Sequence, residues 1–284
     1  MKVGLVVNYK KTNVQKILKE LLSYFKTKKI VPLIEKEGAI KLGFNKYSAT
    51  KLDLIKQSEL ILAIGGDGTL LRAAHIVKNH NIPLLGINLG SLGFLTLFSP
   101  NDALKAIESF INKECLIEKR MVLEVTLGQK KFYALNDCAI NMGPSCRVIE
   151  LVLLSNKSYI CRLIGDGVVI ATPTGSTAYS LSCGGPIIYP SLEVIVITPI
   201  SPHILSGRPI VIPSTEHLVV KLVSHNEDAI LTVDGQIRKK LSPESEVEIR
   251  KAQFNILLVT PSDKSYYDIL RTKMKWAERE ISSF

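Results

Sequence analysis

The stretch that most constrains the fold runs from residue 60 to residue 72 and reads Leu-Ile-Leu-Ala-Ile-Gly-Gly-Asp-Gly-Thr-Leu-Leu-Arg. Its first five residues are apolar, which is typical of a strand that is covered on both faces of a parallel sheet. Gly65, Gly66 and Gly68 then allow a sharp turn and a close approach to a ligand. Thr69 is predicted to cap the next helix, whose free N–H groups favour an anion. The stretch therefore predicts a strand, a turn with an anion site, and a helix.

Asp67 lies in the middle of this predicted anion site. A carboxylate near phosphate costs electrostatic energy, unless it accepts a proton or binds a metal. The stretch is not a Walker phosphate loop, because no Gly-Lys-Ser/Thr follows, and it lacks the G-x-G-x-x-G spacing of dinucleotide folds. A purely structural glycine turn is the alternative, but the strand–turn–helix context favours a functional loop.

Strands and helices are predicted to alternate through the first 95 residues. Strands are predicted at residues 2–8, 30–34, 60–64 and 83–88. Helices are predicted from a Thr12 cap to residue 26, from a Ser48 or Thr50 cap to residue 57, and at 70–79, while 35–47 is either a loop or a short helix. This alternation indicates an open parallel sheet, which binds ligands beyond the carboxyl ends of its strands. Asn8, Asp67 and Asn88 all fall at that edge.

The pattern changes after a predicted helix at residues 99–113. Short strand-like runs then recur at a spacing of about ten residues, as in an all-β sandwich. They lie at residues 122–127, 131–135, 138–141, 148–154, 158–163, 168–171, 194–198, 218–223, 229–233, 247–250 and 254–259. We therefore expect an α/β domain over residues 1–100 and a β-rich, sandwich-like domain over residues 101–259. The segment 260–284, with a basic helix at 265–281, is expected to pack back on the first domain.

Composition narrows the functional classes. The 284 residues include 46% hydrophobic and 22% charged residues, enough apolar material for a sizeable core. The net charge of +10 is spread over dispersed lysines, which favours a solvated basic surface, or a cleft for phosphorylated small molecules, over nucleic-acid binding. No apolar run approaches the roughly 20 residues of a membrane span. The odd number of cysteines, five, without a Cys-x-x-Cys pair, and the absence of a signal-peptide pattern predict a cytoplasmic protein. From the charge distribution and the lack of a long apolar run, we expect it to bind neither nucleic acid nor membranes.

A second polar stretch, residues 165–182, concentrates hydroxyl side chains inside the β-rich domain. Gly175 and Ser176 are predicted to open a short helix whose N–H groups face a ligand, and Tyr179 offers a ring and a hydroxyl. A structural loop is possible, but so dense a polar run more often lines a site. Three shorter signals are the pair Asn136-Asp137, the turn at 202–209 with a structural His203, and the hairpin at 233–236 that ends in Gln236.

In combination and in order, these segments resemble the NAD kinase family over residues 3–236. The run at 172–179 is the most specific, whereas the first glycine loop is shared with diacylglycerol and sphingosine kinases and partly with phosphofructokinases. The resemblance implies a Rossmann-like domain and a β-rich domain with NAD between them. It also implies phosphoryl transfer from ATP or polyphosphate to the 2′-hydroxyl of the adenosine ribose of NAD, with a divalent metal such as Mg²⁺ or Mn²⁺. Members of the family are usually dimers or tetramers of identical chains.

The resemblance also implies roles for individual residues. Asp67 would accept the hydroxyl proton, Gly65, Gly66, Gly68 and Thr69 would form the phosphate loop, and Gly68 would also contact NAD. Arg72 would lie near phosphate. The other substrate-binding residues implied are Asn136, Asp137, Arg147, Asp166, Thr177, Ala178, Tyr179, Ser180, Leu181, Ser182 and Gln236. The chain departs from the family pattern at Asp137, where Glu is common, at Ile164, where a basic residue is common, and at Tyr9, where Pro is common.

Two alternative functions share part of this pattern. A lipid or sphingoid kinase would use the same glycine loop, but the run at 172–179 and the lack of a membrane-binding surface argue against it. A non-catalytic NAD-binding sensor would not need Asp67, which is intact together with its glycines. The sequence therefore favours an enzyme that phosphorylates NAD.

Overall fold

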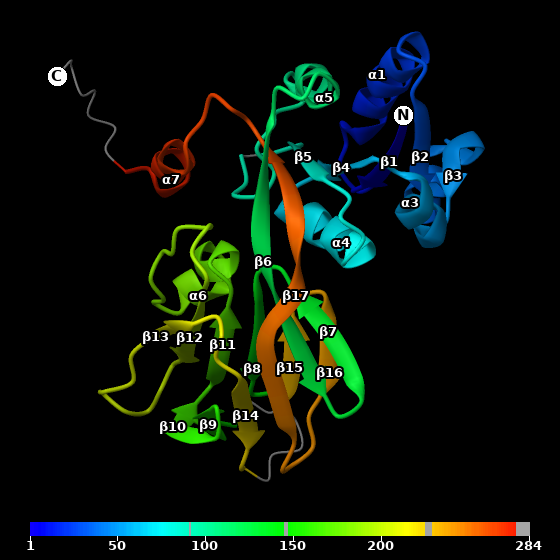
Figure 1. The fold of residues 1–284 in the computed structure, drawn as a ribbon. Coiled ribbons are helices and arrows are strands. Elements are labelled where there is room, and N and C mark those ends of the chain that lie inside the picture. Colours follow the sequence, from blue (N-terminus) through cyan, green and yellow to red (C-terminus); the bar gives the residue numbers. More distant parts are fainter. Residues whose placement is uncertain (91, 145–146, 225–228, 277–284) are drawn as a thin grey trace, which may run out of the picture. The chain divides into compact units, whose positions relative to one another are not determined.

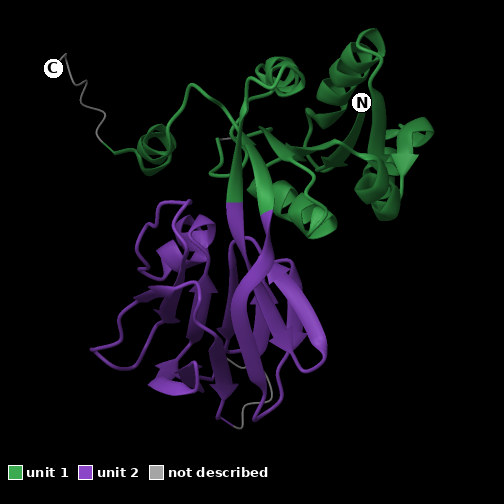
Figure 2. Cartoon of the chain, viewed as in Figure 1, with its two compact units in different colours: residues 1–119, 256–284 green, residues 120–255 purple. Residues whose placement is uncertain are grey.

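The computed structural model describes residues 1–90, 92–144, 147–224 and 229–276. The chain divides into two compact units, one made of residues 1–119 with 256–284 and the other of residues 120–255 (Figure 2). The first boundary between the units lies after Lys119, whereas the sequence predicted a boundary between residues 100 and 101. The reason is that the helix after residue 100 contributes Ala103, Ala106 and Ile107 to the core of unit 1.

Unit 1 contains the expected open parallel sheet (Figure 1). Its strands are β1 (Lys2–Val7), β2 (Val31–Glu35), β3 (Ser48–Ala49), β4 (Leu60–Gly65), β5 (Leu84–Asn88) and the end of β17 (Glu246–Thr260). They are ordered β17-β5-β4-β1-β2-β3, and every neighbouring pair is parallel. The register pairs Gly65 with Asn88, so both residues lie at the carboxyl edge, as predicted.

Helices cover both faces of this sheet. They are α1 (Val14–Thr27), α2 (Lys36–Leu42), α3 (Lys51–Gln57), α4 (Asp67–Val77), α5 (Ala103–Ile111) and α7 (Tyr266–Met274), with a 3-10 turn at Asn45–Tyr47. Side chains of α1, α5 and α7 share one buried cluster with the strands. The helices α3 and α4 pack on the other face, where Leu54 meets Gly4 and Leu70 meets Gly86. The burial of Ile269 in the same cluster confirms that the C-terminal helix packs on this domain.

The helix ends differ from the predictions in instructive ways. Thr50 caps α3 through a reciprocal capping box, as predicted, whereas α1 starts at Val14 without any side-chain cap, so the Thr12 cap is wrong. Helix α4 starts at Asp67, so Thr69 lies inside its first turn and is not the cap. Helix α7 ends at Met274, and the part of the predicted helix beyond residue 276 lies outside the described residues.

Unit 2 is the antiparallel, sandwich-like domain that the strand spacing predicted. One sheet has the order β13-β12-β11-β8-β15-β16, and the other contains β10, β9, β14, β17, β6 and β7. The strands are β6 (Leu116–Leu127), β7 (Lys130–Ala134), β8 (Asp137–Asn141), β9 (Ile149–Ser155), β10 (Ser158–Gly165), β11 (Gly167–Ala171), β12 (Val194–Ile200), β13 (Ile210–Pro213), β14 (Leu218–Leu222), β15 (Ile230–Val233) and β16 (Ile237–Lys240). A 3-10 turn (Thr174–Thr177) and α6 (Tyr179–Ser182) follow β11. Inward side chains of both sheets form one buried cluster.

Two features of unit 2 were not predicted. The runs at 247–250 and 254–259 form one strand, β17, and Ala252, between the two runs, is buried. The edge strands β13 and β16 were missed because one ends in proline and the other is rich in lysine and arginine. No helix in the described parts of the chain is long and apolar enough to cross a membrane. The cytoplasmic location stays a prediction.

Candidate active site

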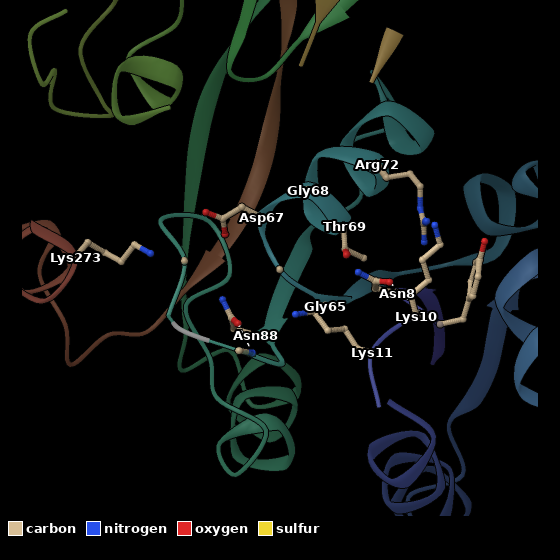
Figure 3. A pocket seen from close by; sticks show the side chains of 14 residues that line it. Asn8, Lys10, Lys11, Gly65, Asp67, Gly68, Thr69, Arg72, Asn88 and Lys273 are labelled. Atoms are coloured by element: carbon tan, nitrogen blue, oxygen red, sulfur yellow. Dashed lines mark hydrogen bonds between the residues drawn. The ribbon is translucent and has the colours of Figure 1, made fainter. Parts of the chain in front are cut away.

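A cavity of about 530 Å³ opens in unit 1 at the carboxyl ends of β1, β4 and β5 (Figure 3). Asn8, Lys10 and Lys11 reach it from the loop after β1. The first two turns of α4, directly after the glycine turn, supply Asp67 and Arg72. The cavity therefore lies where an open parallel sheet binds its ligands.

The glycine turn is shaped by one close contact. A Cβ on Gly65 would lie 2.2 Å from Thr69 Oγ1, so the turn closes only without a side chain there. The backbone N–H of Thr69 donates to the carbonyl of Gly66 at 2.8 Å, which fixes the first turn of α4. A Cβ at Gly66 or Gly68 would meet open space. Thr69 thus shapes the loop from inside, and the backbone at Gly66 and Gly68 has room for a ligand.

The Asp67 carboxylate is held by the loop after β5. Its Oδ1 accepts hydrogen bonds from the backbone N–H groups of Leu95 (3.2 Å) and Thr96 (2.9 Å) and from Thr96 Oγ1 (2.8 Å). Among the described residues, its Oδ2 accepts one bond, from the N–H of Phe94 (2.9 Å). These donors offset the cost of a carboxylate beside a phosphate site. Since a carboxylate oxygen accepts about two hydrogen bonds, Oδ2 keeps capacity for a substrate hydroxyl.

Two neighbours fix the loop that holds Asp67. Asn88, at the end of β5, donates from Nδ2 to Thr96 Oγ1 at 2.8 Å, which leaves the Thr96 hydroxyl proton for Asp67. A Cβ on Gly93 would lie 2.0 Å from Asp67 Oδ1, so only glycine permits this close approach. The hydrogen bonds of this loop to Asp67 were not predicted from the sequence, because they join segments that are 27 to 29 residues apart.

Arg72 lies in the cavity wall, as the resemblance implied, but its guanidinium is already engaged. Its Nη2 donates to the carbonyl of Val7 at 2.8 Å and to Glu35 Oε2 at 3.0 Å. Glu35 is only 8% exposed, and this burial raises the pKa of its carboxyl group, while the nearby Arg72 opposes the rise. Arg72 therefore places a fixed positive charge one helical turn from Asp67.

The charges around the cavity are strongly biased. Among the described residues that line it, Asp67 is the only acid, whereas Lys10, Lys11, Arg72 and Lys273 are cationic. A cleft lined by one sign of charge concentrates ligands of the opposite sign. Lys273, which comes from α7, was missed because nothing in the local sequence links the C-terminal helix to the glycine loop. No group of three or more His, Cys, Asp or Glu side chains suited to a metal ion occurs in the described parts of the chain.

The other predicted site residues lie in unit 2, around the start of β8. Asp137 is its first residue and is 6% exposed. Burial, and next the charge of Asp234, raise the pKa of Asp137 to about 7, although the backbone N–H of Tyr179 donates to its carboxylate. Asp234 accepts hydrogen bonds from the backbone N–H groups of Leu135, Asn136 and Asp137 at 2.9, 2.8 and 3.1 Å. Asp234, in the hairpin predicted at 233–236, therefore fixes the backbone at Asn136.

The hydroxyl-rich run proves to be partly structural. Thr172 Oγ1 donates to the carbonyl of Leu135, Ser176 Oγ to that of Pro173, and Ser180 Oγ pairs with Thr198 Oγ1 at 2.8 Å in the interior. A Cβ on Gly175 would lie 2.0 Å from the carbonyl oxygen of Asn136, so the run packs directly against the Asn136 backbone. The dense hydroxyls therefore hold the loop as well as line a surface.

The remaining predicted site residues of unit 2 differ in their exposure to solvent. Tyr179 is 39% exposed and Ser180 is fully buried. Thr177, Ala178, Leu181 and Asp166 are half-buried, while Ser182, Arg147 and Gln236 are exposed. Ile164, where the family often has a basic residue, is 40% exposed.

Comparison with known proteins gives consistent matches along the chain. The model of the ATP-NAD kinase N-terminal domain matches residues 3–115, and that of the ATP-NAD kinase C-terminal domain matches residues 135–260. The NAD kinase of Geobacter metallireducens is 37% identical over 270 residues, which cover 93% of this chain and 95% of that protein. The NAD kinase of Fusobacterium nucleatum is 37% identical over 279 residues, 98% of each chain.

Solved structures agree. Yeast NADH kinase complexed with NADH superposes with a TM-score of 0.88 at 26% identity and covers 100% of this chain and 89% of the yeast chain. An NAD kinase from Archaeoglobus fulgidus in complex with ATP has a TM-score of 0.79 at 24% identity, covers 96% of this chain and 99% of its own, and shows the shared fold. With both domain models matched in order and relatives of this identity spanning nearly the whole chain, the protein belongs to the ATP-NAD kinase family.

Proposed function

We propose that the chain is an NAD kinase, which transfers the terminal phosphoryl group of ATP to the 2′-hydroxyl of the adenosine ribose of NAD and so produces NADP. The observation that carries this proposal is the Asp67 carboxylate, which is oriented by the loop at 93–96 inside a cavity whose other charged lining residues are cationic. One group is suited to accept a hydroxyl proton, and the surrounding charges are suited to phosphate.

The proposed reaction needs few covalent steps. The ribose hydroxyl proton passes to Asp67 Oδ2 as a bond forms between the ribose oxygen and the γ-phosphorus. The bond between that phosphorus and the bridging oxygen breaks, and its electron pair leaves with ADP. Alignment and charge neutralisation supply most of the rate enhancement in such transfers. In this chain the fixed Arg72 and the lysines of the cavity provide positive charge.

ATP fits the family description better than polyphosphate, so we take ATP as the donor and polyphosphate as the alternative to be assayed. The residues of the cavity fit a metal that arrives with the donor, because Mg²⁺ usually keeps several waters and binds substrate phosphates together with one or two carboxylates. Asp67 is the only carboxylate among the described lining residues and its Oδ2 is assigned to the ribose proton, so the donor phosphates and water would supply most of the metal's ligands. Mg²⁺ or Mn²⁺, when bound, would neutralise phosphate charge.

The unit 2 residues Asn136, Asp137, Asp166, Tyr179 and Gln236 are proposed to bind NAD, together with the other residues implied by the family resemblance. Their support is local: Asp234 and Gly175 fix the backbone at Asn136 from two sides. The exposed ring of Tyr179 offers a stacking surface beside the buried Asp137.

We also propose that the chain forms a homo-oligomer, a dimer or tetramer, through unit 2. The edge strand β13 exposes Ile210 and Val211, and Leu205 in the preceding loop is 96% exposed. Unpaired edges with apolar side chains favour pairing with another chain. In sedimentation velocity, Leu205→Asp should shift the protein to a smaller species, whereas Tyr267→Asp, which changes an exposed residue of α7, should not. An unchanged sedimentation coefficient for Leu205→Asp would rule out this surface.

The central test is the formation of NADP. Purified protein with NAD, Mg²⁺ and ATP should produce NADP, and Asp67→Asn should lose most turnover while it still binds NAD. Full activity of Asp67→Asn would refute the role of Asp67 as the proton acceptor. Phosphorylation of diacylglycerol or sphingosine would favour a lipid kinase, and NAD binding without NADP formation with any donor would favour a sensor.

A further inference from the structure

The C-terminal helix α7 sends one side chain into the cavity. Ile269 and Leu270 are 6% and 5% exposed and anchor the helix in unit 1. Lys273 follows them by four and three residues, so it lies on the same face of the helix. Lys273 and the adjacent Met274 are half-buried, whereas Thr272 and Lys275 are exposed. The anchoring of α7 therefore directs Lys273 toward the cavity, as Figure 3 shows.

Lys273 is connected to Asp67 through one residue. Its Nζ lies 5.7 Å from the centroid of the Phe94 ring, a cation–π distance. The backbone N–H of the same Phe94 donates to Asp67 Oδ2, the oxygen with capacity for a substrate hydroxyl. Phe94 therefore contacts Lys273 through its ring and Asp67 through its backbone, and both side chains line the same cavity.

The cavity holds more positive charge than the protein itself neutralises. In the described parts of the chain, Lys10, Lys11 and Lys273 have no carboxylate within ion-pair distance, whereas Arg72 is paired with Glu35. In Figure 3, Lys273 and Lys11 enter from opposite sides of the view and point toward its centre. Unpaired ammonium groups that converge on one cavity favour a ligand with several negative charges.

We infer that Lys273 binds the terminal phosphoryl group of the donor, a nucleoside triphosphate or an inorganic polyphosphate, and stabilises its charge during transfer. This inference rests on the proposed kinase function. The link from Lys273 through Phe94 to Asp67 assigns Lys273 to the phosphate that meets the ribose hydroxyl. The C-terminal helix is then part of the catalytic site.

The test compares Lys273→Gln with Lys275→Gln, a matched loss of one charge at the end of the same helix. Lys273→Gln should lower kcat/KM for ATP by about 10- to 100-fold, the effect of one charge-assisted hydrogen bond. Lys275→Gln should stay within about twofold of the parent, and Lys273→Arg should retain most activity because it keeps the charge. The KM for NAD should not change in any of the three variants.

A binding measurement separates this inference from the proposed function. Calorimetric titration with inorganic tripolyphosphate should show weaker binding to Lys273→Gln than to Lys275→Gln, whether or not NADP is formed. If the parent enzyme makes NADP but the two variants have equal tripolyphosphate affinities and equal kcat/KM values, the role of Lys273 is refuted and the kinase function is not. A change confined to the KM for NAD would contradict the assignment to the donor. A parent that makes no NADP would refute the kinase function instead.

Discussion

The buried carboxyl group of Asp137 should make the stability of the protein depend on pH. This residue begins β8 at 6% exposure, beside the 7% exposed Asp234. Among the described residues, Asp234 accepts bonds from the backbone N–H groups at 135–137, and Asp137 accepts one from the backbone of Tyr179. Burial beside the charge of Asp234 therefore favours the protonated form of Asp137.

The size and sign of the effect follow from the pKa values. Burial, followed by the charge of Asp234, raises the pKa of Asp137 from 3.8 to about 7 in the folded protein. Between these values the folded state binds a proton that the unfolded state releases, so the free energy of unfolding decreases as the pH rises. The contribution is fully present below about pH 4 and is lost once the pH exceeds about 7, and it amounts to about 4 kcal/mol.

The substitution Asp137→Asn keeps an acceptor for the Tyr179 N–H but removes the titration. Urea unfolding, followed by circular dichroism at several pH values from 4 to 8, should show that the variant gains about 4 kcal/mol relative to the parent across that range. Asp263→Asn, at an exposed carboxylate in unit 1, serves as the control and should follow the parent at every pH. A difference between Asp137→Asn and the parent that does not change with pH would refute the reasoning.

Three further substitutions test the hydrogen bonds described above. Thr96→Val removes the hydroxyl that donates to Asp67, so kcat should fall about tenfold with little change in the KM for ATP, and Thr96→Ser should restore it. Gly93→Ala would place a Cβ 2.0 Å from Asp67 Oδ1, and steady-state assays should show at least a tenfold loss of NADP formation. Asp234→Ala leaves three consecutive backbone N–H groups without their acceptor, and urea unfolding should show a loss of about 3 kcal/mol or more.

Local sequence patterns predicted most of the fold because its elements are marked by local signals. The all-apolar run before Gly65, the alternation of strands and helices, and the capping residue Thr50 each depend on a few neighbouring residues. The misplaced caps at Thr12 and Thr69 show where such signals mislead, because a polar residue near a helix start also has other roles. Thr69 packs against Gly65 and shapes the turn.

Local sequence signals could not predict the contacts in the site between residues that are far apart in the chain. Asp67 was predicted as the working group, yet the residues that orient it lie in a separate loop that only the sheet brings near. Lys273 is more than 200 positions farther along the chain and reaches the cavity through the packing of Ile269. Similarly, the sequence around Asp234 predicts only a hairpin, whereas in the structure its carboxylate accepts hydrogen bonds from the backbone at 135–137. Propensity and spacing carry no information about such contacts.

The division of unit 1 between two segments of the chain has a consequence for synthesis. Residues 1–119 leave the ribosome first, but β5 lacks its neighbour β17, and the cavity lacks Lys273, until residues 256–276 have followed. Unit 2, which is continuous from residue 120 to residue 255, emerges in between and has its own buried core. Since domains generally fold as units during translation, unit 2 is free to fold while unit 1 still has an open sheet edge. The nascent chain therefore completes the cavity that holds Asp67 and Lys273 only after the intervening domain has been made.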